Sequence, residues 1–140
     1  MKLSVVVPLY NEEKSLPELA DALIGVVDAR GYDAEIIFVD DGSTDGSFAA
    51  CTALHERDPR RIRVYRFGRN YGKAAALSVG IEKARGEIVV TMDADLQDDP
   101  QAIPQMVEKM DNEEWDLVSG WKKKRRDPLS KTFPSKIFNI

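Results

Sequence analysis

The sequence predicts a single α/β domain built on a mainly parallel β-sheet. Short apolar runs alternate along the chain with segments whose apolar residues recur at helical spacing, and this alternation is typical of sheets whose strands are joined by helices. The runs are apolar throughout, as in strands that are buried on both faces. With 140 residues, 43% of them hydrophobic, the chain is long enough to bury a core of its own.

Four apolar runs predict the strands of this sheet. The expected strands are Leu3 to Val7, ended by Pro8, and then Ile36 to Val39, Ile62 to Phe67 and Ile88 to Met92. The expected helices run from after Asn11 to a stop at Gly31, from the 40–45 turn to about His55, from Gly72 to Ala84 and from about Ala102 to Met110. A last short strand is expected from Leu117 to Ser119.

Polar clusters follow all four of the main strands. These clusters are residues 8–12, 40–45, 68–73 and 93–99. The carboxyl ends of parallel strands share one edge of the sheet, and ligands bind outside that edge in open α/β folds. We therefore expect the clusters to form one rim around a binding site.

Two aspartates stand directly after the fourth strand. A single residue, Ala94, separates Asp93 from Asp95, so both carboxylates can reach the same cation. Gln97 can add a neutral oxygen. Mn²⁺ and Mg²⁺ prefer oxygen ligands and complete their coordination with water and substrate phosphates. The alternative is a helix cap, because Asp98 and Asp99 also precede a helix. The position on the rim favours a metal site.

The second strand ends in two adjacent carboxylates, Asp40 and Asp41. An acidic side chain at a strand end can accept hydrogen bonds from ribose hydroxyls or from a nucleobase. A turn that caps the next helix explains Ser43 to Asp45 but leaves two carboxylates in a row unexplained. Tyr10 offers a flat face for a base, with a partly buried aromatic as the alternative.

Lys73 follows a glycine at the start of a predicted helix, where charge and free backbone amides can approach a diphosphate. The segment is not a P-loop, because three residues separate Gly68 from Gly72 and Ala74 stands where Ser or Thr is required. The first strand is not followed by a dinucleotide-binding glycine motif either. Cys51 and His55 are expected to be packing and surface residues.

Composition and charge exclude several classes of protein. One cysteine and one histidine exclude a disulfide framework and a zinc cluster. The sequence has no signal peptide and no apolar run of roughly 20 residues, so we expect a cytoplasmic protein.

The charge is distributed unevenly along the chain. Residues 122–140 hold 7 basic and 1 acidic side chains, while the preceding part is acidic. Lys122 to Arg126 can meet an anionic membrane or substrate phosphates, with a solvated loop as the alternative, and nucleic acid is not expected.

Taken together, the rim segments resemble the inverting family-2 glycosyltransferases. The segments that carry the resemblance are Pro8 to Glu12, Val39 to Asp45, Asn70 to Lys73 and Asp93 to Gln97. Within that family the chain is most similar to the polyprenyl-phosphate sugar transferases such as dolichyl-phosphate mannose synthase. The resemblance covers about Met1 to Trp121 and implies a GT-A fold, a Rossmann-like α/β sandwich.

The resemblance also implies a division of roles among the rim residues. The residues implied for the nucleotide-sugar donor are Pro8, Tyr10, Glu12, Asp40, Asp41, Lys73 and Asp93, and those implied for Mn²⁺ or Mg²⁺ are Asp93, Asp95 and Gln97. The donor would be a UDP- or GDP-sugar and the acceptor a polyprenyl phosphate. The full-length protein would then work at the cytoplasmic face of a membrane.

The chain is shorter than members of the family normally are. We therefore expect residues 1–121 to be the donor-binding domain and residues 122–140 to be a basic tail that opens an acceptor half. The general base is expected beyond Ile140, so the 140 residues alone would be an inactive fragment. The alternatives are a sugar nucleotidyltransferase, a module that binds a nucleotide sugar without turnover, and an aspartyl-nucleophile phosphatase with Asp93 as nucleophile.

Overall fold

The computed structural model describes residues 1–113 and 116–118. The chain divides into two units after Pro100, and each is described by itself. The elements of the first unit, in chain order, are β1 (Leu3–Leu9), α1 (Leu16–Arg30), β2 (Ala34–Asp40), α2 (Ser47–Arg57), β3 (Ile62–Arg66), α3 (Lys73–Lys83) and β4 (Ile88–Thr91). A 3₁₀ turn, η1 (Pro100–Ala102), precedes α4 (Ile103–Asn112) of the second unit. The four main strands and the helices that follow them are those expected from the sequence.

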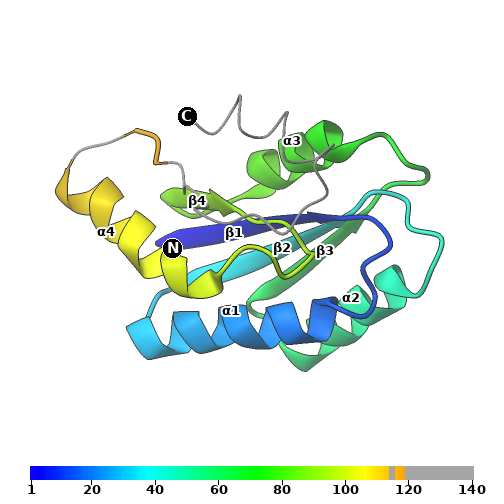
Figure 1. Cartoon of the computed structure of the whole chain (residues 1–140), viewed down its shortest axis with the longest axis horizontal. Helices are drawn as coiled ribbons and strands as arrows, with labels where there is room; N and C mark the ends of the chain where they lie inside the picture. Colours follow the sequence, from blue (N-terminus) through cyan, green and yellow to red (C-terminus); the bar gives the residue numbers. More distant parts are fainter. Residues whose placement is uncertain (114–115, 119–140) are drawn as a thin grey trace. The chain divides into compact units, whose positions relative to one another are not determined.

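The four strands form one sheet in the order β3-β2-β1-β4, and every pair is parallel. The expected parallel α/β architecture is confirmed. Figure 1 shows α1 and α2 on one face of this sheet and α3 on the other. The chain therefore runs outward from β1 to β3 and returns along α3 to place β4 on the free side of β1. In open α/β sheets, ligands bind at the carboxyl ends of the strands where the strand order reverses in this way, which here lies between β1 and β4.

Close packing holds α3 against the middle of the sheet. Gly80 lies so near β1 that a Cβ atom there would come within 2.2 Å of Val6 Cγ1. Ala76, one turn earlier, belongs to a buried cluster with Val6, Ile37 and Val39. Only small residues fit a helix this close to the sheet, because protein interiors leave no spare volume. The small face of α3 therefore fixes how the chain returns to β4.

Pro8 does not end β1, which continues to Leu9. The carbonyls of Lys2 and Val6 accept hydrogen bonds from the backbone N–H groups of Ile88, in β4, and Met92, directly after it, so the even-numbered residues of β1 face that neighbour. The pairing with β4 stops at Val6, opposite Thr91. Successive residues of a parallel strand direct their backbone hydrogen bonds alternately to one neighbouring strand and to the other. Pro8 faces the β4 side but lies beyond the end of β4, so its missing N–H removes no hydrogen bond from the sheet.

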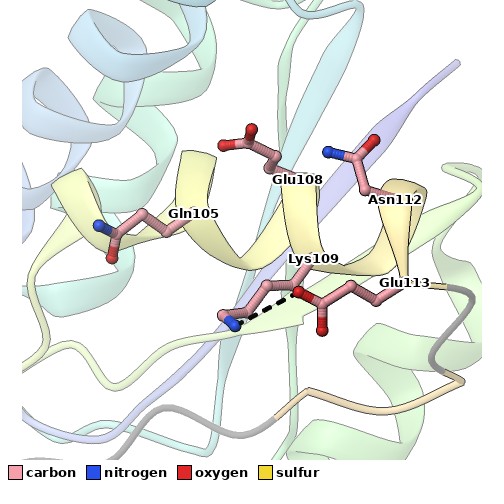
Figure 2. Close-up of a pocket in the computed structure, with 5 residues that line it drawn as sticks. All are labelled: Gln105, Glu108, Lys109, Asn112 and Glu113. Carbon is pink, nitrogen blue, oxygen red and sulfur yellow. Dashed lines mark ion pairs between the residues drawn. The ribbon is translucent and has the colours of Figure 1, made fainter.

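The second unit contributes one described helix, α4. Its buried residues are Ile103, Pro104 and Val107. Figure 2 shows the polar side chains that line a pocket on this helix, where Lys109 pairs with Glu113 at 3.7 Å. None of the candidate site residues from the sequence lines it. The strand expected from Leu117 is wrong for residues 117–118, which are irregular, and Ser119 and the basic tail lie outside the described residues.

Among the described residues, no helix is long and apolar enough to cross a membrane.

A buried carboxylate, Glu35, ties the strands together at the edge opposite the rim. Its side chain is fully buried and accepts hydrogen bonds from Ser4 Oγ at 2.7 Å, Arg63 Nη1 at 2.9 Å, and the backbone and guanidinium of Arg85. Burial raises the pKa of Glu35, but the hydrogen bonds from Ser4, Arg63 and Arg85 outweigh this effect and bring the pKa down to about 2 from its ordinary 4.5. The ionised form is therefore strongly favoured in the folded protein.

We predict that the Glu35 network contributes stability that acid removes. Because the folded-state pKa lies below the unfolded value, this contribution is complete above about pH 4.5 and is lost as the pH falls toward about 2. Glu35→Gln should lower the free energy of unfolding at neutral pH by about 3 kcal/mol, at the low end of the range for buried ion pairs because both arginines are partly exposed.

Urea denaturation at a series of pH values measures this effect. The matched control is Glu87→Gln, whose exposed pair with Lys2 should contribute under about 1 kcal/mol. Parallel loss of stability in the wild type and in Glu35→Gln as the pH falls would contradict the prediction.

Candidate functional site

Asn11 joins the ends of β1 and β2 at the rim. Its backbone N–H donates to Ser43 Oγ at 2.9 Å, and its side-chain oxygen accepts the backbone N–H groups of Thr44 at 2.9 Å and Asp45 at 3.3 Å. Asn11 has a positive φ of 53°, which asparagine tolerates better than most residues. The sequence did not single out this residue as a functional one, although its side chain fixes the two loops that border the site.

The loop after β4 is tied to the start of α1. The hydroxyl of Ser15 donates to the backbone carbonyl of Ala94 at 2.6 Å. The backbone N–H of Asp93 donates to Asp98 Oδ2 at 2.9 Å, and Asp95 Oδ1 accepts the backbone N–H of Gln97 at 3.1 Å. Asp98 therefore supports the turn that carries both candidate metal ligands, in addition to its position before a helix.

Asp40 is fully buried at the end of β2, and half of its carboxylate lacks a partner. Oδ1 accepts the backbone N–H of Ser43 at 2.9 Å, whereas Oδ2 has no hydrogen bond within the described part of the chain. The nearest cationic atom is Arg66 Nε, 3.9 Å from Oδ2, and the guanidinium of Arg66 also stacks on the ring of Phe48. A buried acceptor without a donor costs about 1 to 3 kcal/mol.

Asp41 has a different environment from its neighbour. Its carboxylate accepts the backbone N–H of Tyr71 at 2.8 Å and that of Gly72 at 3.0 Å, and the residue is 4% exposed. These bonds hold the loop before α3 against the end of β2. Gly42 allows this approach, since it has a φ of 74° and a Cβ there would lie 2.3 Å from the carbonyl carbon of Arg69. Asp41 therefore organises a loop with both of its oxygens, whereas Asp40 leaves one oxygen without a hydrogen bond.

Lys73 and Asp93 form an ion pair across the rim. Lys73 is the first residue of α3, so its backbone is fixed by the loop that Asp41 holds. Asp93 follows β4, and its side chain is 35% exposed. The structure therefore brings together two of the residues that the sequence assigned to the donor.

The turn after β4 offers carboxylate oxygens of the kind that Mg²⁺ and Mn²⁺ prefer. No cluster of three or more His, Cys, Asp or Glu residues suited to a metal occurs in residues 1–113 and 116–118. Asp93 and Asp95, with Gln97 exposed beside them, therefore fit an ion whose remaining ligands are water and substrate phosphates. The Lys73 ammonium beside Asp93 shows that this carboxylate already attracts a cation.

The remaining candidates lie along β1 and just beyond it. Pro8 is buried within the strand, while Tyr10 is 43% exposed. The carboxylate of Glu12 lies 3.2 Å from the Ser15 hydroxyl, and the backbone N–H of Glu12 donates to Ser47 Oγ at 2.8 Å. Each of these residues stands at the rim, and their roles toward a nucleotide stay predictions.

Cys51 and His55 were expected to be packing and surface residues; Cys51 is buried and His55 is partly buried. Burial, and to a smaller degree the charge of Asp40, raise the pKa of the Cys51 thiol to about 12, so the thiol stays protonated. The Nδ1 atom of His55 lies 2.6 Å from the carbonyl oxygen of Ile62 and donates to it.

Comparison with known proteins gives a consistent family and fold. The model of the family described as glycosyl transferase family 2 matches residues 4–139. A dodecaprenyl-phosphate galacturonate synthase of Rhizobium johnstonii is 40% identical over 92% of this chain and 38% of that protein. An undecaprenyl-phosphate 4-deoxy-4-formamido-L-arabinose transferase of Pseudomonas paraeruginosa is 41% identical over 99% of this chain and 40% of that protein. The chain thus spans about two fifths of the length of these relatives.

Solved structures show the same fold. S. aureus TarS matches with a TM-score of 0.68 and 26% identity over 93% of this chain and 39% of that one. The mannosyltransferase PcManGT of Pyrobaculum calidifontis, in complex with GDP-Man and Mn²⁺, matches with a TM-score of 0.65 and 32% identity over 78% of this chain and 32% of that one. The expected GT-A type of α/β fold is confirmed. Since the family match runs through almost the whole sequence, the chain belongs to glycosyl transferase family 2.

Proposed function

We propose that this chain is the donor-binding part of a metal-assisted, inverting glycosyltransferase that moves a sugar from a nucleotide-diphospho-sugar to a polyprenyl phosphate. The observation that carries the proposal is the Asp93–Asp95 turn, braced by Ser15 and Asp98, with the Lys73 ammonium beside it. A fixed pair of carboxylates next to a cation suits a diphosphate bound with a divalent ion. The relatives named for transfer to dodecaprenyl or undecaprenyl phosphate support the acceptor class.

Asp40 is the residue that we propose for the nucleoside. Its buried Oδ2 has no donor in the described residues, and a ribose hydroxyl or a nucleobase N–H would supply one. Tyr10, 43% exposed on the neighbouring strand end, adds an aromatic face for the base. We propose Pro8 and Glu12 as further contacts of the donor, with Asp41 acting through the loop that it holds.

The diphosphate is proposed to lie between Lys73 and the Asp93–Asp95 turn. A bound Mn²⁺ or Mg²⁺ supplies Lewis-acid stabilisation of the charge that develops on the leaving nucleoside diphosphate. The protein contributes the two carboxylates, the amide oxygen of Gln97 and the charge of Lys73, all held at one edge by the parallel sheet. One solved structure of this fold contains GDP-Man and Mn²⁺, and another contains UDP. The binding experiments therefore use both UDP and GDP.

Membrane association is part of the same proposal. Lys122 to Arg126 lie outside the described residues, and five cations in a row would attract an anionic membrane that contains the acceptor. The two relatives are named for transfer to polyprenyl phosphates, which are lipids. Family membership favours this function over a nucleotidyltransferase or an aspartyl phosphatase.

Transfer itself is tested with the complete gene product. Radiolabelled UDP- and GDP-sugars are incubated with undecaprenyl phosphate, and label is counted in the lipid phase. Metal-dependent label in the lipid that is lost in Asp95→Ala supports the proposal. Donor binding without any transfer would instead assign the protein to the class that binds nucleotide sugars without turnover.

We predict that the 140-residue chain alone binds donor without multiple-turnover transfer to lipid. The chain spans about two fifths of its relatives, and positioning of an acceptor can supply roughly 7 to 11 kcal/mol of a barrier. The same radiolabel assay, run beside the complete gene product, measures this difference. Sustained transfer by the short chain would show that the base and acceptor site lie within these residues.

We predict that substitution of Asp40 affects nucleotide binding, whereas substitution of Asp41 affects stability. Asp40→Asn should weaken UDP or GDP binding by about 1.5 to 3 kcal/mol while leaving stability unchanged, because the asparagine oxygen can still accept from Ser43 and the other oxygen of Asp40 has no hydrogen bond to lose. Asp41→Ala should instead lower the free energy of unfolding by about 2 kcal/mol, because two backbone N–H groups lose their acceptor. Calorimetry and urea denaturation measure the two quantities. Unfolding of Asp40→Asn with normal binding by the folded fraction would remove Asp40 from the site.

We predict that Mn²⁺ binds mainly together with nucleotide. Two carboxylates leave most of an octahedral shell to water, so added UDP or GDP should raise Mn²⁺ affinity on the order of 5- to 150-fold. Titration calorimetry with and without nucleotide measures the increase. Asp95→Ala should abolish it, whereas Asp21→Asn, on an exposed carboxylate of α1 that pairs with Arg57, should not. Equal nucleotide binding with and without metal would remove the metal assignment.

A further inference from the structure

The geometry points to Lys73 as an internal cation that occupies the Asp93 carboxylate until a nucleoside diphosphate draws it away. This inference rests on the proposed function. It adds that the binding of metal and the binding of nucleotide are coupled through Lys73. Lys73 becomes a residue that controls access of the metal to Asp93, in addition to a contact of the diphosphate.

The backbone of Lys73 is held in place while its side chain is not. Asp41 fixes the two preceding residues through the backbone N–H groups of Tyr71 and Gly72. Gly72 has a φ of 104°, which turns the chain sharply into α3. The side chain of Lys73 is 60% exposed, and its four-carbon stem allows the ammonium to move without any change in the helix.

The backbone of Asp93 is held in place as well, so both partners of the ion pair start from fixed backbone positions. The backbone N–H of Asp93 donates to Asp98, and the next residue, Ala94, accepts from Ser15. Among the described residues, Lys73 is the cation that pairs with this turn. A divalent ion that uses the same carboxylate must therefore displace the ammonium or bind beside a like charge.

The strength of the pair suits a residue that changes partner. Both side chains are partly exposed, and exposed ion pairs are weak, so the ammonium should lower the affinity for metal by only about two- to fivefold. A diphosphate offers several anionic oxygens to the same ammonium, and it would lie at the start of α3, where free backbone N–H groups also favour anions. Arrival of the diphosphate therefore releases Asp93 to the metal.

The test compares Mn²⁺ binding in wild type, Lys73→Met and Lys73→Arg, with Lys83→Met as the matched control at the other end of α3. Free Mn²⁺ is measured by electron paramagnetic resonance, first without nucleotide and then with saturating UDP or GDP. Lys73→Met should bind Mn²⁺ alone about two- to fivefold more tightly than wild type. Its gain in affinity on addition of nucleotide should shrink by at least the same factor. Lys73→Arg, which keeps the charge, should restore the weak binding, and Lys83→Met should match wild type.

Two results separate this inference from the proposed function. Weaker nucleotide binding in Lys73→Met with unchanged affinity for Mn²⁺ alone would overturn the inference, and it would leave Lys73 as a simple diphosphate contact. Absence of UDP and GDP binding in wild type, with or without Mn²⁺, would overturn the proposed function. Tighter Mn²⁺ binding by Lys73→Met would in that case still support the competition at Asp93.

Discussion

The close packing of α3 on the sheet is the constraint on which the rest of the site depends. Gly80 and Ala76 let the helix approach β1 and β2, and α3 then returns the chain across the sheet to β4. This return puts β4 beside β1 and brings Asp93 within reach of Lys73. A larger side chain at Gly80 would push α3 away from β1. Lys73, at the start of α3, would then move away from Asp93.

Hydrogen bonds from short polar side chains then fix the loops at the rim. Asn11 joins the ends of β1 and β2, Asp41 holds the loop before α3, and Ser15 holds the loop after β4. Each bond satisfies backbone groups that the turns leave unpaired, so the loops are ordered by the protein itself. Two groups remain. Asp40 Oδ2 has no hydrogen-bond partner among the described residues, and Lys73 pairs with Asp93 through an ammonium that can move.

The two edges of the sheet use buried charge in opposite ways. At the amino edge, Glu35 is fully buried and surrounded by donors, and its pKa of about 2 reflects a carboxylate whose bonds are complete. At the carboxyl edge, Asp40 is equally buried but only half satisfied. Completed networks stabilise a fold, whereas an unpaired buried group costs free energy that a ligand can recover. This contrast supports the proposal that the ligand binds at the carboxyl edge of the sheet.

The sequence by itself determined the strands, the helices and the edge that carries the candidate site. Apolar runs, glycine stops and polar clusters after strands are local features, and they survive in the structure with shifts of a few residues. Tertiary structure decided what local pattern does not encode. Pro8 stays inside β1 because β4 ends before it, and the strand expected from Leu117 is absent over 117–118. The different environments of Asp40 and Asp41, and the pairing of Lys73 with Asp93, depend on residues about 20 to 30 positions apart, which meet only when the sheet is assembled.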